Sequence, residues 1–157
     1  MSTIEDRLRS LGLALPTPVA AVANYVPAHQ VGPLLFISGQ LPFGPDGKLG
    51  DAQKGKLREG VAVDAPAEAA KLCALNLIAQ AKAALGDLTR IRRVVRLGGF
   101  FAVEGTFPGM AHAMNGASDL FVALLGDKGR HARTTIGVAY LPMNAMAEIE
   151  ATFEVEA

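Results

Sequence analysis

The sequence AEIEATFEV at residues 147–155 alternates apolar and polar side chains without interruption. Side chains along a β-strand point alternately to its two faces, so a period of two predicts a strand with one buried face and one wet face. A strand of this kind belongs to a sheet that is covered on one side only. The rest of the chain has to supply that cover.

Two long helices are expected to provide it. Residues 65–85 are rich in alanine, which favours a helix, with Asp64 placed to be the N-cap and Gly86 just beyond the last turn. A second helix is predicted from about residue 108 to residue 125, closed by Gly126.

The remaining segments read as strands, turns and one short helix. An amphipathic helix is expected over residues 3–13, and a loop that is exposed and mobile over residues 43–60. Further strands are predicted at residues 20–28, 34–37, 90–103 and 131–140, with hairpins around residues 32–33 and 142–144 and a bend or bulge at Gly98-Gly99.

This order of elements predicts an α+β fold: one mixed sheet with the two long helices packed on one face. A chain of 157 residues and 16.4 kDa is expected to form a single domain, residues 1–157, in which residues 1–18 are an N-terminal helical extension. Half of the residues are hydrophobic and 19% are charged, which excludes disorder and favours an oligomer.

Charge and residue types narrow the classes of function. Fifteen basic and fifteen acidic residues cancel, so nucleic acid is a disfavoured partner, and a single cysteine excludes a disulfide framework. The three histidines lack ligand spacing and no phosphate-binding glycine motif occurs, so we expect neither a metal nor a nucleotide cofactor. With no signal peptide and no apolar run of membrane-spanning length, a cytoplasmic protein without membrane contact is expected.

Two residues near the C-terminus could carry chemistry. Arg133 lies among small residues at the start of a predicted strand, where its guanidinium could hold a carboxylate through two hydrogen bonds or form an ordinary salt bridge. Glu148 could be a general acid or base, or one of the polar residues on the wet face. Arginines 90, 92, 93 and 96 form a basic cluster typical of a solvated strand end.

Three separated blocks carry a resemblance to a known family. They are NYV (24–26) with GPLLFISGQ (32–40), Asn115 in the second long helix, and AR (132–133) followed by LP (141–142) and EIE (148–150). In this order they resemble the Rid/YjgF family, also known as L-PSP endoribonucleases or reactive-intermediate imine deaminases. The resemblance implies a chorismate-mutase-like α+β fold, a homotrimer around a central barrel of sheets, and clefts between subunits.

The same resemblance implies roles for single residues. Arg133 matches the arginine that holds the carboxylate of a 2-imino acid, and Glu148 matches the glutamate that activates water. Thr135 stands where the best-known members carry a cysteine, so a backbone role there survives and a thiol role does not. The remaining cleft positions that the resemblance implies are Tyr25, Ser38, Gly39 and Asn115.

The implied activity is hydrolytic deamination of small 2-imino or enamine acids to 2-oxo acids and ammonia, without a cofactor. One alternative is a trimer that binds a small carboxylate metabolite without turnover, as a sensor or chaperone-like protein. RNA cleavage is a third, weakened by the lack of a histidine pair or a metal cluster.

If residues 142–144 form a hairpin turn, Arg133 and Glu148 lie about six residues out of register, or roughly 20 Å apart at about 3.3 Å per residue. The two side chains could then meet on one small ligand only if different subunits contribute them.

Overall fold

The computed structural model describes residues 3–157, which form a five-stranded mixed sheet and three α-helices. The strands are β1 (Ala28–Val31), β2 (Leu34–Gln40), β3 (Ile91–Ala102), β4 (Ala132–Val138) and β5 (Ala147–Val155). The α-helices are α1 (Ile4–Ser10), α2 (Asp64–Leu85) and α3 (Met110–Leu125). Short 3₁₀ turns occur at Asp51–Gln53, Leu88–Arg90, Gly126–Gly129 and Pro142–Asn144.

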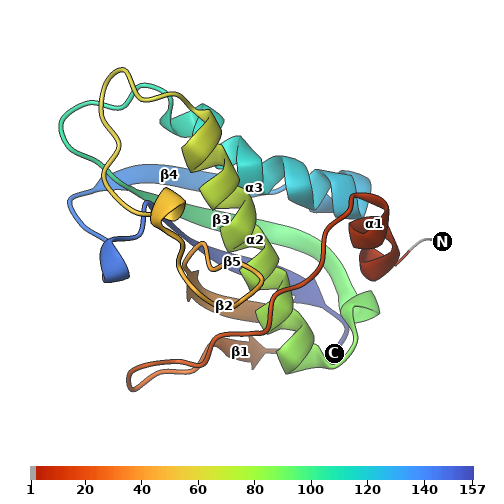
Figure 1. Ribbon diagram of the computed structural model, residues 1–157. Coiled ribbons are helices and arrows are strands. Elements are labelled where there is room, and N and C mark those ends of the chain that lie inside the picture. The colour runs from red at the N-terminus through yellow and green to blue at the C-terminus, as the bar shows by residue number, and fades with distance from the viewer. Residues whose placement is uncertain (1–2) are drawn as a thin grey trace.

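The strand order is β1-β2-β5-β3-β4, with every neighbouring pair antiparallel except β3 and β4, which run parallel. The helices α2 and α3 lie side by side across one face of this sheet, and the opposite face carries no helix (Figure 1). The predicted α+β architecture, with both long helices on one face, is therefore confirmed. No helix within residues 3–157 is both long and apolar enough to span a membrane.

β5 lies at the centre of the sheet, between β2 and β3. Its burial alternates as the sequence predicts: Ile149 and Phe153 are fully buried beneath the helices, and the glutamates at positions 148, 150 and 154 face the other side. The most regular alternation in the sequence thus belongs to the central strand of the sheet.

Both long helices end at the predicted glycines. Gly86 and Gly126 have φ of 76° and 60°, a left-handed backbone that glycine adopts without strain. The start of α2 differs from the prediction, because Asp64 is its first helical residue and Val63 is the N-cap. The carboxylate of Asp64 lies in the first turn, where the helix dipole favours negative charge without a capping hydrogen bond.

The predicted hairpin between the last two strands is wrong. β4 pairs with β3 in parallel, and β3 separates β4 from β5. The connection between β4 and β5 passes over the end of β3, where the amide of Ala102 donates to Met146 O at 3.0 Å and that of Val103 donates to Val138 O at 2.8 Å. In the sequence a connection this short resembles a hairpin turn, but here it joins two strands that have β3 between them.

The strand predicted at residues 20–28 is also wrong. Only its last residue belongs to β1, which forms the expected hairpin with β2 around Gly32 at φ 57°. Residues 20–27 form no ladder with β2, although the amide of Ser38 donates to Pro27 O at 2.9 Å, and Tyr25 and Val26 are more than half exposed. Without a ladder partner, an extended segment lacks the hydrogen bonds that define a strand.

Gly98 and Gly99 do not bend β3, which pairs regularly there and is irregular only between residues 91 and 96. Their absent side chains make room for neighbours instead. A Cβ on Gly98 would lie 2.7 Å from Glu150 Oε1, and one on Gly99 would lie 2.5 Å from Met114 Sδ. The glycines allow side chains on both faces to approach the sheet closely.

The 43–60 loop is mostly exposed, as predicted, but it is anchored. Leu49 and Leu57 are buried, and the amide of Leu57 donates to Ala102 O at 2.8 Å. The amide of Met146 donates to Gln53 O at 2.8 Å, so the loop is held against the connection before β5. Buried leucines among glycines and lysines give this loop more order than its composition predicts.

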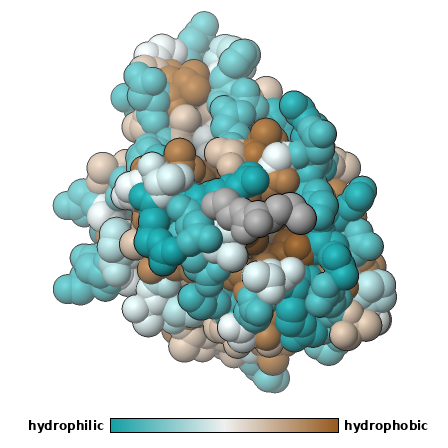
Figure 2. All heavy atoms as spheres, turned by 90° about the vertical axis from the view of Figure 1, so that its right-hand side faces the viewer, coloured by the Kyte–Doolittle hydropathy of each residue, from teal (hydrophilic) through white to brown (hydrophobic). Residues whose placement is uncertain are grey.

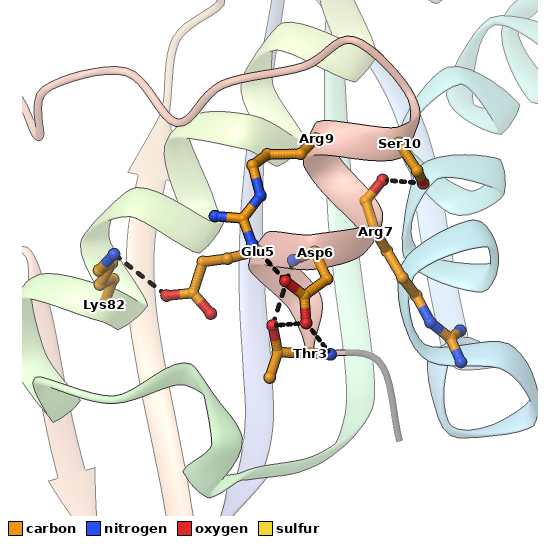
Figure 3. A network of polar contacts seen from close by, with 7 residues as sticks. All are labelled: Thr3, Glu5, Asp6, Arg7, Arg9, Ser10 and Lys82. Carbon is orange, nitrogen blue, oxygen red and sulfur yellow. Dashed lines mark hydrogen bonds and ion pairs between the residues drawn. The ribbon is translucent and has the colours of Figure 1, made fainter.

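The N-terminal helix predicted over residues 3–13 is present as α1, which is shorter and spans Ile4–Ser10. Thr3 and Asp6 form a capping box, and Glu5 forms an ion pair with Lys82 of α2 at 3.1 Å (Figure 3). Ile4 and Leu8 are buried in the core. On the face that carries α1, hydrophilic side chains surround separate hydrophobic areas (Figure 2).

The close packing of α2 on α3 gives a prediction for Gly116. A Cβ at this position would lie 1.9 Å from Ala67 O of α2, which is backbone and cannot yield easily. Gly116→Ala should therefore destabilise the fold by about 1–3 kcal/mol through overpacking, although alanine is the better helix former. The measurement is urea unfolding. As a control, Ala123→Gly at an exposed position of α3 should cost only about 1 kcal/mol. A Gly116→Ala protein more stable than the wild type would contradict this packing.

Candidate functional site

The guanidinium of Arg133 is tied to α3 by three hydrogen bonds. Nη1 donates to Asn115 Oδ1 at 2.8 Å and to Ser118 Oγ at 3.0 Å, and Nη2 donates to Ala111 O at 3.0 Å. Positions 111, 115 and 118 follow the i, i+4, i+7 spacing that places residues on one face of a helix. That face of α3 meets β4, and it fixes the orientation of the arginine.

Two of the five guanidinium donors remain free. Nε–H and one hydrogen of Nη2 have no acceptor among residues 3–157. The side chain is half-buried, so these donors are partly shielded from water. Because hydrogen bonds already hold one side of the planar guanidinium, Arg133 can bind a carboxylate with little loss of side-chain entropy.

Arg133 lines a surface pocket of about 240 Å³ together with Ser118, Arg130 and His131, called the Arg133 pocket below. Two residues further along β4, Thr135 has a buried hydroxyl without a hydrogen-bond partner. Alternation along the strand places Thr135 and Arg133 on the same face. Because this hydroxyl is buried, it does not line the Arg133 pocket.

Glu148 lies on the helix-free face of the sheet, in register with Phe100 of β3. Burial raises the pKa of its carboxyl above the ordinary value, and the negative charge of Glu150 raises it further. The carboxylate sits over Gly39, where a Cβ would lie 2.2 Å from Glu148 Oε1. Any larger residue at position 39 would displace the carboxylate.

Tyr25 and Ser38 border a hollow on this same face, which has a volume of about 660 Å³ and is also lined by Arg96 and Glu150. The Ser38 hydroxyl donates to Val26 O at 2.7 Å. This bond holds the 20–27 segment against β2, so Ser38 has a structural role in one chain.

The sequence-predicted residues therefore form two groups on opposite faces. Arg133, Asn115 and Thr135 lie toward α3, whereas Glu148, Gly39 and their neighbours lie on the helix-free face. The hairpin on which the 20 Å estimate rests does not exist. Arg133 and Glu148 are offset by three residues along β3, about 10 Å, and by two strand spacings, about 10 Å more in the perpendicular direction.

Sequence reasoning missed three residues of the Arg133 pocket, Ser118, Arg130 and His131. Ser118 accepts a hydrogen bond from Arg133, and its Oγ lies 2.9 Å from His131 Nε2. The signal available in the sequence was weak: Ser118 is one turn after Asn115, and His131 is two residues before Arg133. Only the packing of α3 on β4 brings them together.

Three arginines of the basic cluster, Arg92, Arg93 and Arg96, lie on β3 and are paired with carboxylates. Arg93 contacts Glu154 at 3.2 Å and Arg96 contacts Glu150 at 3.7 Å, both across the β3–β5 pair. These arginines therefore do not form a row of unpaired positive charges. Across residues 3–157 no group of three potential metal ligands comes together.

Comparisons with known proteins identify the family of the chain. The family model described as “YjgF/chorismate mutase-like, putative endoribonuclease” matches residues 5–154. A crystal structure of a protein of unknown function from Agrobacterium tumefaciens, Atu1372, is 47% identical, with a TM-score of 0.88 over 98% of this chain and 92% of that one.

Two further crystal structures are similar. A “putative endoribonuclease” from Shewanella oneidensis is 37% identical, with a TM-score of 0.91 over 98% of this chain and 99% of that chain. RidA from an Antarctic Psychrobacter is 30% identical, with a TM-score of 0.59 over 88% of this chain and 94% of that chain.

The raised pKa of Glu148 gives a prediction about stability. A carboxyl whose pKa is higher in the folded than in the unfolded protein stabilises the fold below its unfolded pKa, and this contribution is lost as the pH rises through the folded pKa. Glu148→Gln removes the buried charge and should raise the melting temperature at about pH 8, with no difference at about pH 3.

Glu154→Gln is the matched control, because Glu154 lies on the same strand and pairs with Arg93. It should not raise the melting temperature at either pH. Equal melting temperatures for wild type and Glu148→Gln at pH 8 would show that the carboxylate is well solvated.

Proposed function

Because the chain belongs to the YjgF/chorismate mutase-like family, we propose that it hydrolyses small 2-imino acids to 2-oxo acids and ammonia. The observation that carries the proposal is the orientation of Arg133, which has three hydrogen bonds to α3 and two free donors. A guanidinium with two free N–H donors suits the carboxylate of a small metabolite. The family resemblance adds the reaction, since it matches Arg133 and Glu148 to the functional pair of imine deaminases.

The reaction requires a positioned substrate and a base for water. Arg133 would fix the carboxylate, and the backbone of Thr135, two residues further along β4, would supply the further contact that the family resemblance implies. Glu148 would take a proton from the attacking water and return it to the nitrogen. Its raised pKa improves it as a base near neutral pH, because a proton acceptor works best when its pKa approaches the working pH.

We also propose that the site is shared between subunits of a homotrimer with a central barrel of sheets. Arg133 and Glu148 point to opposite faces of one sheet, so one chain does not bring them onto one small ligand. The helix-free face exposes Phe36 and Ile136, each more than 40% accessible, and needs apolar cover. Tyr25 and Ser38, on the rim of the hollow in this face, would contact the substrate from the same subunit as Glu148.

The test uses 2-iminopropanoate generated in situ, with pyruvate as a stable carboxylate for binding. Arg133→Ala should abolish both hydrolysis and pyruvate binding, because the charge and the free N–H donors are lost together. Arg133→Lys should give intermediate values, since lysine keeps the charge and loses the two-donor geometry. Glu148→Gln should reduce kcat by about 10²-fold or more and leave pyruvate affinity within a few fold.

The control is again Glu154→Gln, which should hydrolyse the imine at the wild-type rate. Wild-type hydrolysis by Glu148→Gln would remove Glu148 from the mechanism. A wild-type protein that binds pyruvate through Arg133 without accelerating hydrolysis would instead be a carboxylate-binding protein.

A further inference from the structure

Three polar side chains of residues 3–157 are buried, and all three lie around the end of β2. They are Gln40 of that strand and Asn76 and Gln80 of α2, each at most 7% exposed, and are called the amide cluster below. Burying an amide costs free energy unless its hydrogen bonds are restored inside the protein. The bonds of the amide cluster therefore show what it holds in place.

β2 contains a β-bulge immediately before Gln40. Ile37 pairs with Ala151 and Gln40 pairs with Ile149, so three steps along β2 correspond to two steps along β5. In a regular strand residue 39 would share the face of Ile37, which is buried beneath the helices. The extra residue reverses the alternation, so Gln40 reaches α2 and Gly39 lies on the helix-free face.

The bulge provides the place where the Glu148 carboxylate lies. A Cβ on residue 39 would be 2.2 Å from Glu148 Oε1 and 3.0 Å from its Cδ, so the carboxylate lies directly on the Gly39 backbone. Without the bulge, regular pairing would bring Gln40 directly opposite Glu148, with its side chain on the same face as the carboxylate. The position of Glu148 thus depends on the bulge.

The amide cluster holds this bulge. Gln40 Nε2 donates to Ser38 O at 3.0 Å and to Gly39 O at 3.3 Å, the two carbonyls of the bulge. Gln80 Nε2 donates to Gln40 Oε1 at 3.3 Å, so the NH2 group of Gln40 is left to bind those carbonyls. These bonds connect the bulge with α2.

The same cluster fixes the segments on either side. Asn76 Nδ2 donates to Phe43 O at 2.8 Å, in the segment that follows β2. Gln80 Nε2 also donates to Val19 O at 2.7 Å, just before the 20–27 segment that carries Tyr25. Both segments are therefore tied to the same helix as the bulge.

We propose that Gln40 and Gln80 are positioning residues for Glu148, because they hold the bulge on which its carboxylate lies. The inference rests on the proposed function and deepens it, since Glu148 is the base that this function requires. Both glutamines lie on the helix side of the sheet, so neither touches the substrate. Methionine at both positions would fill a similar volume, so the amides are required for the shape of β2 and not for packing.

The test is a double-mutant cycle between this pair of glutamines and Glu148. Gln40→Met/Gln80→Met removes both amides at once, and the backbone carbonyls that lose their donors belong to half-buried residues that water can reach. In the wild-type background Glu148→Gln should raise the melting temperature at about pH 8. In the Gln40→Met/Gln80→Met background this gain should disappear, because a carboxylate that leaves the bulge is hydrated.

Catalysis provides a second readout. Gln40→Met/Gln80→Met should lower kcat for 2-iminopropanoate at least about 10-fold, because the base is displaced. Pyruvate affinity should stay within about 3-fold of the wild type, since the three hydrogen bonds of Arg133 all go to α3. The acid limb of the rate profile should move to lower pH, because hydration lowers the pKa of the Glu148 carboxyl.

Two further variants separate positioning from a general loss of stability. Gln80→Met alone leaves Gln40 on the bulge and should change the same quantities in the same direction, by less. Leu124→Ala is the control, because Leu124 is buried beside Ile91 where β3 begins, whereas Glu148 is in register with Phe100 near the other end. It should lower the melting temperature through a cavity and leave kcat, the pH profile and the gain from Glu148→Gln unchanged.

Two outcomes would overturn the positioning role. One is an equal gain from Glu148→Gln at pH 8 in both backgrounds, which is the additivity of independent sites. The other is a wild-type kcat and pH profile in Gln40→Met/Gln80→Met. A wild-type protein that does not hydrolyse the imine would remove the proposed function, and the melting cycle alone would then confirm or overturn the placing of Glu148 by the two glutamines.

Discussion

The parallel pairing of β4 with β3 is the constraint on which the site depends. Parallel neighbours need a crossover connection, and α3 provides it by running back across the face of the sheet. That path brings one stripe of α3 over β4, so Ala111, Asn115 and Ser118 reach the guanidinium of Arg133. If β4 paired with β5 in a hairpin, Arg133 would lie beside other residues. The three α3 residues would then have no guanidinium to bind. The orientation of a single side chain thus follows from the order of the strands.

The sheet also separates the two charged groups that the proposed reaction needs. Arg133 is held on the helix side, whereas Glu148 is half-buried on the helix-free side with its pKa raised by burial and by Glu150. The buried carboxylate costs stability in one chain, and that cost has no structural benefit there. Functional groups often carry such costs, because an environment that shifts a pKa also disfavours the charged form. A second chain whose pocket meets this face would complete the site.

Patterns within one element could be predicted from the sequence, and pairings between elements could not. The alternation in β5 and the glycines after α2 and α3 are local signals, and the structure matches them. The partner of β4 and the missing ladder for residues 20–27 depend on distant segments, so local patterns gave the wrong answer. The candidate site follows the same division: the family blocks predicted Arg133 and Asn115, which the structure joins by a hydrogen bond, whereas Ser118 and His131 meet only through helix-on-strand packing.

The central claim, that one site needs residues from two chains, is tested most directly by mixing inactive variants. Arg133→Ala and Glu148→Gln chains are unfolded together, refolded as mixed assemblies and assayed for 2-iminopropanoate hydrolysis. If Arg133 of one subunit meets Glu148 of the next, each mixed trimer contains one intact site, and an equal mixture regains about a quarter of wild-type activity. The account predicts this recovery in assemblies of about 49 kDa, three times the 16.4 kDa chain. Activity no greater than that of the separate variants, in assemblies shown to be mixed, would contradict a shared site.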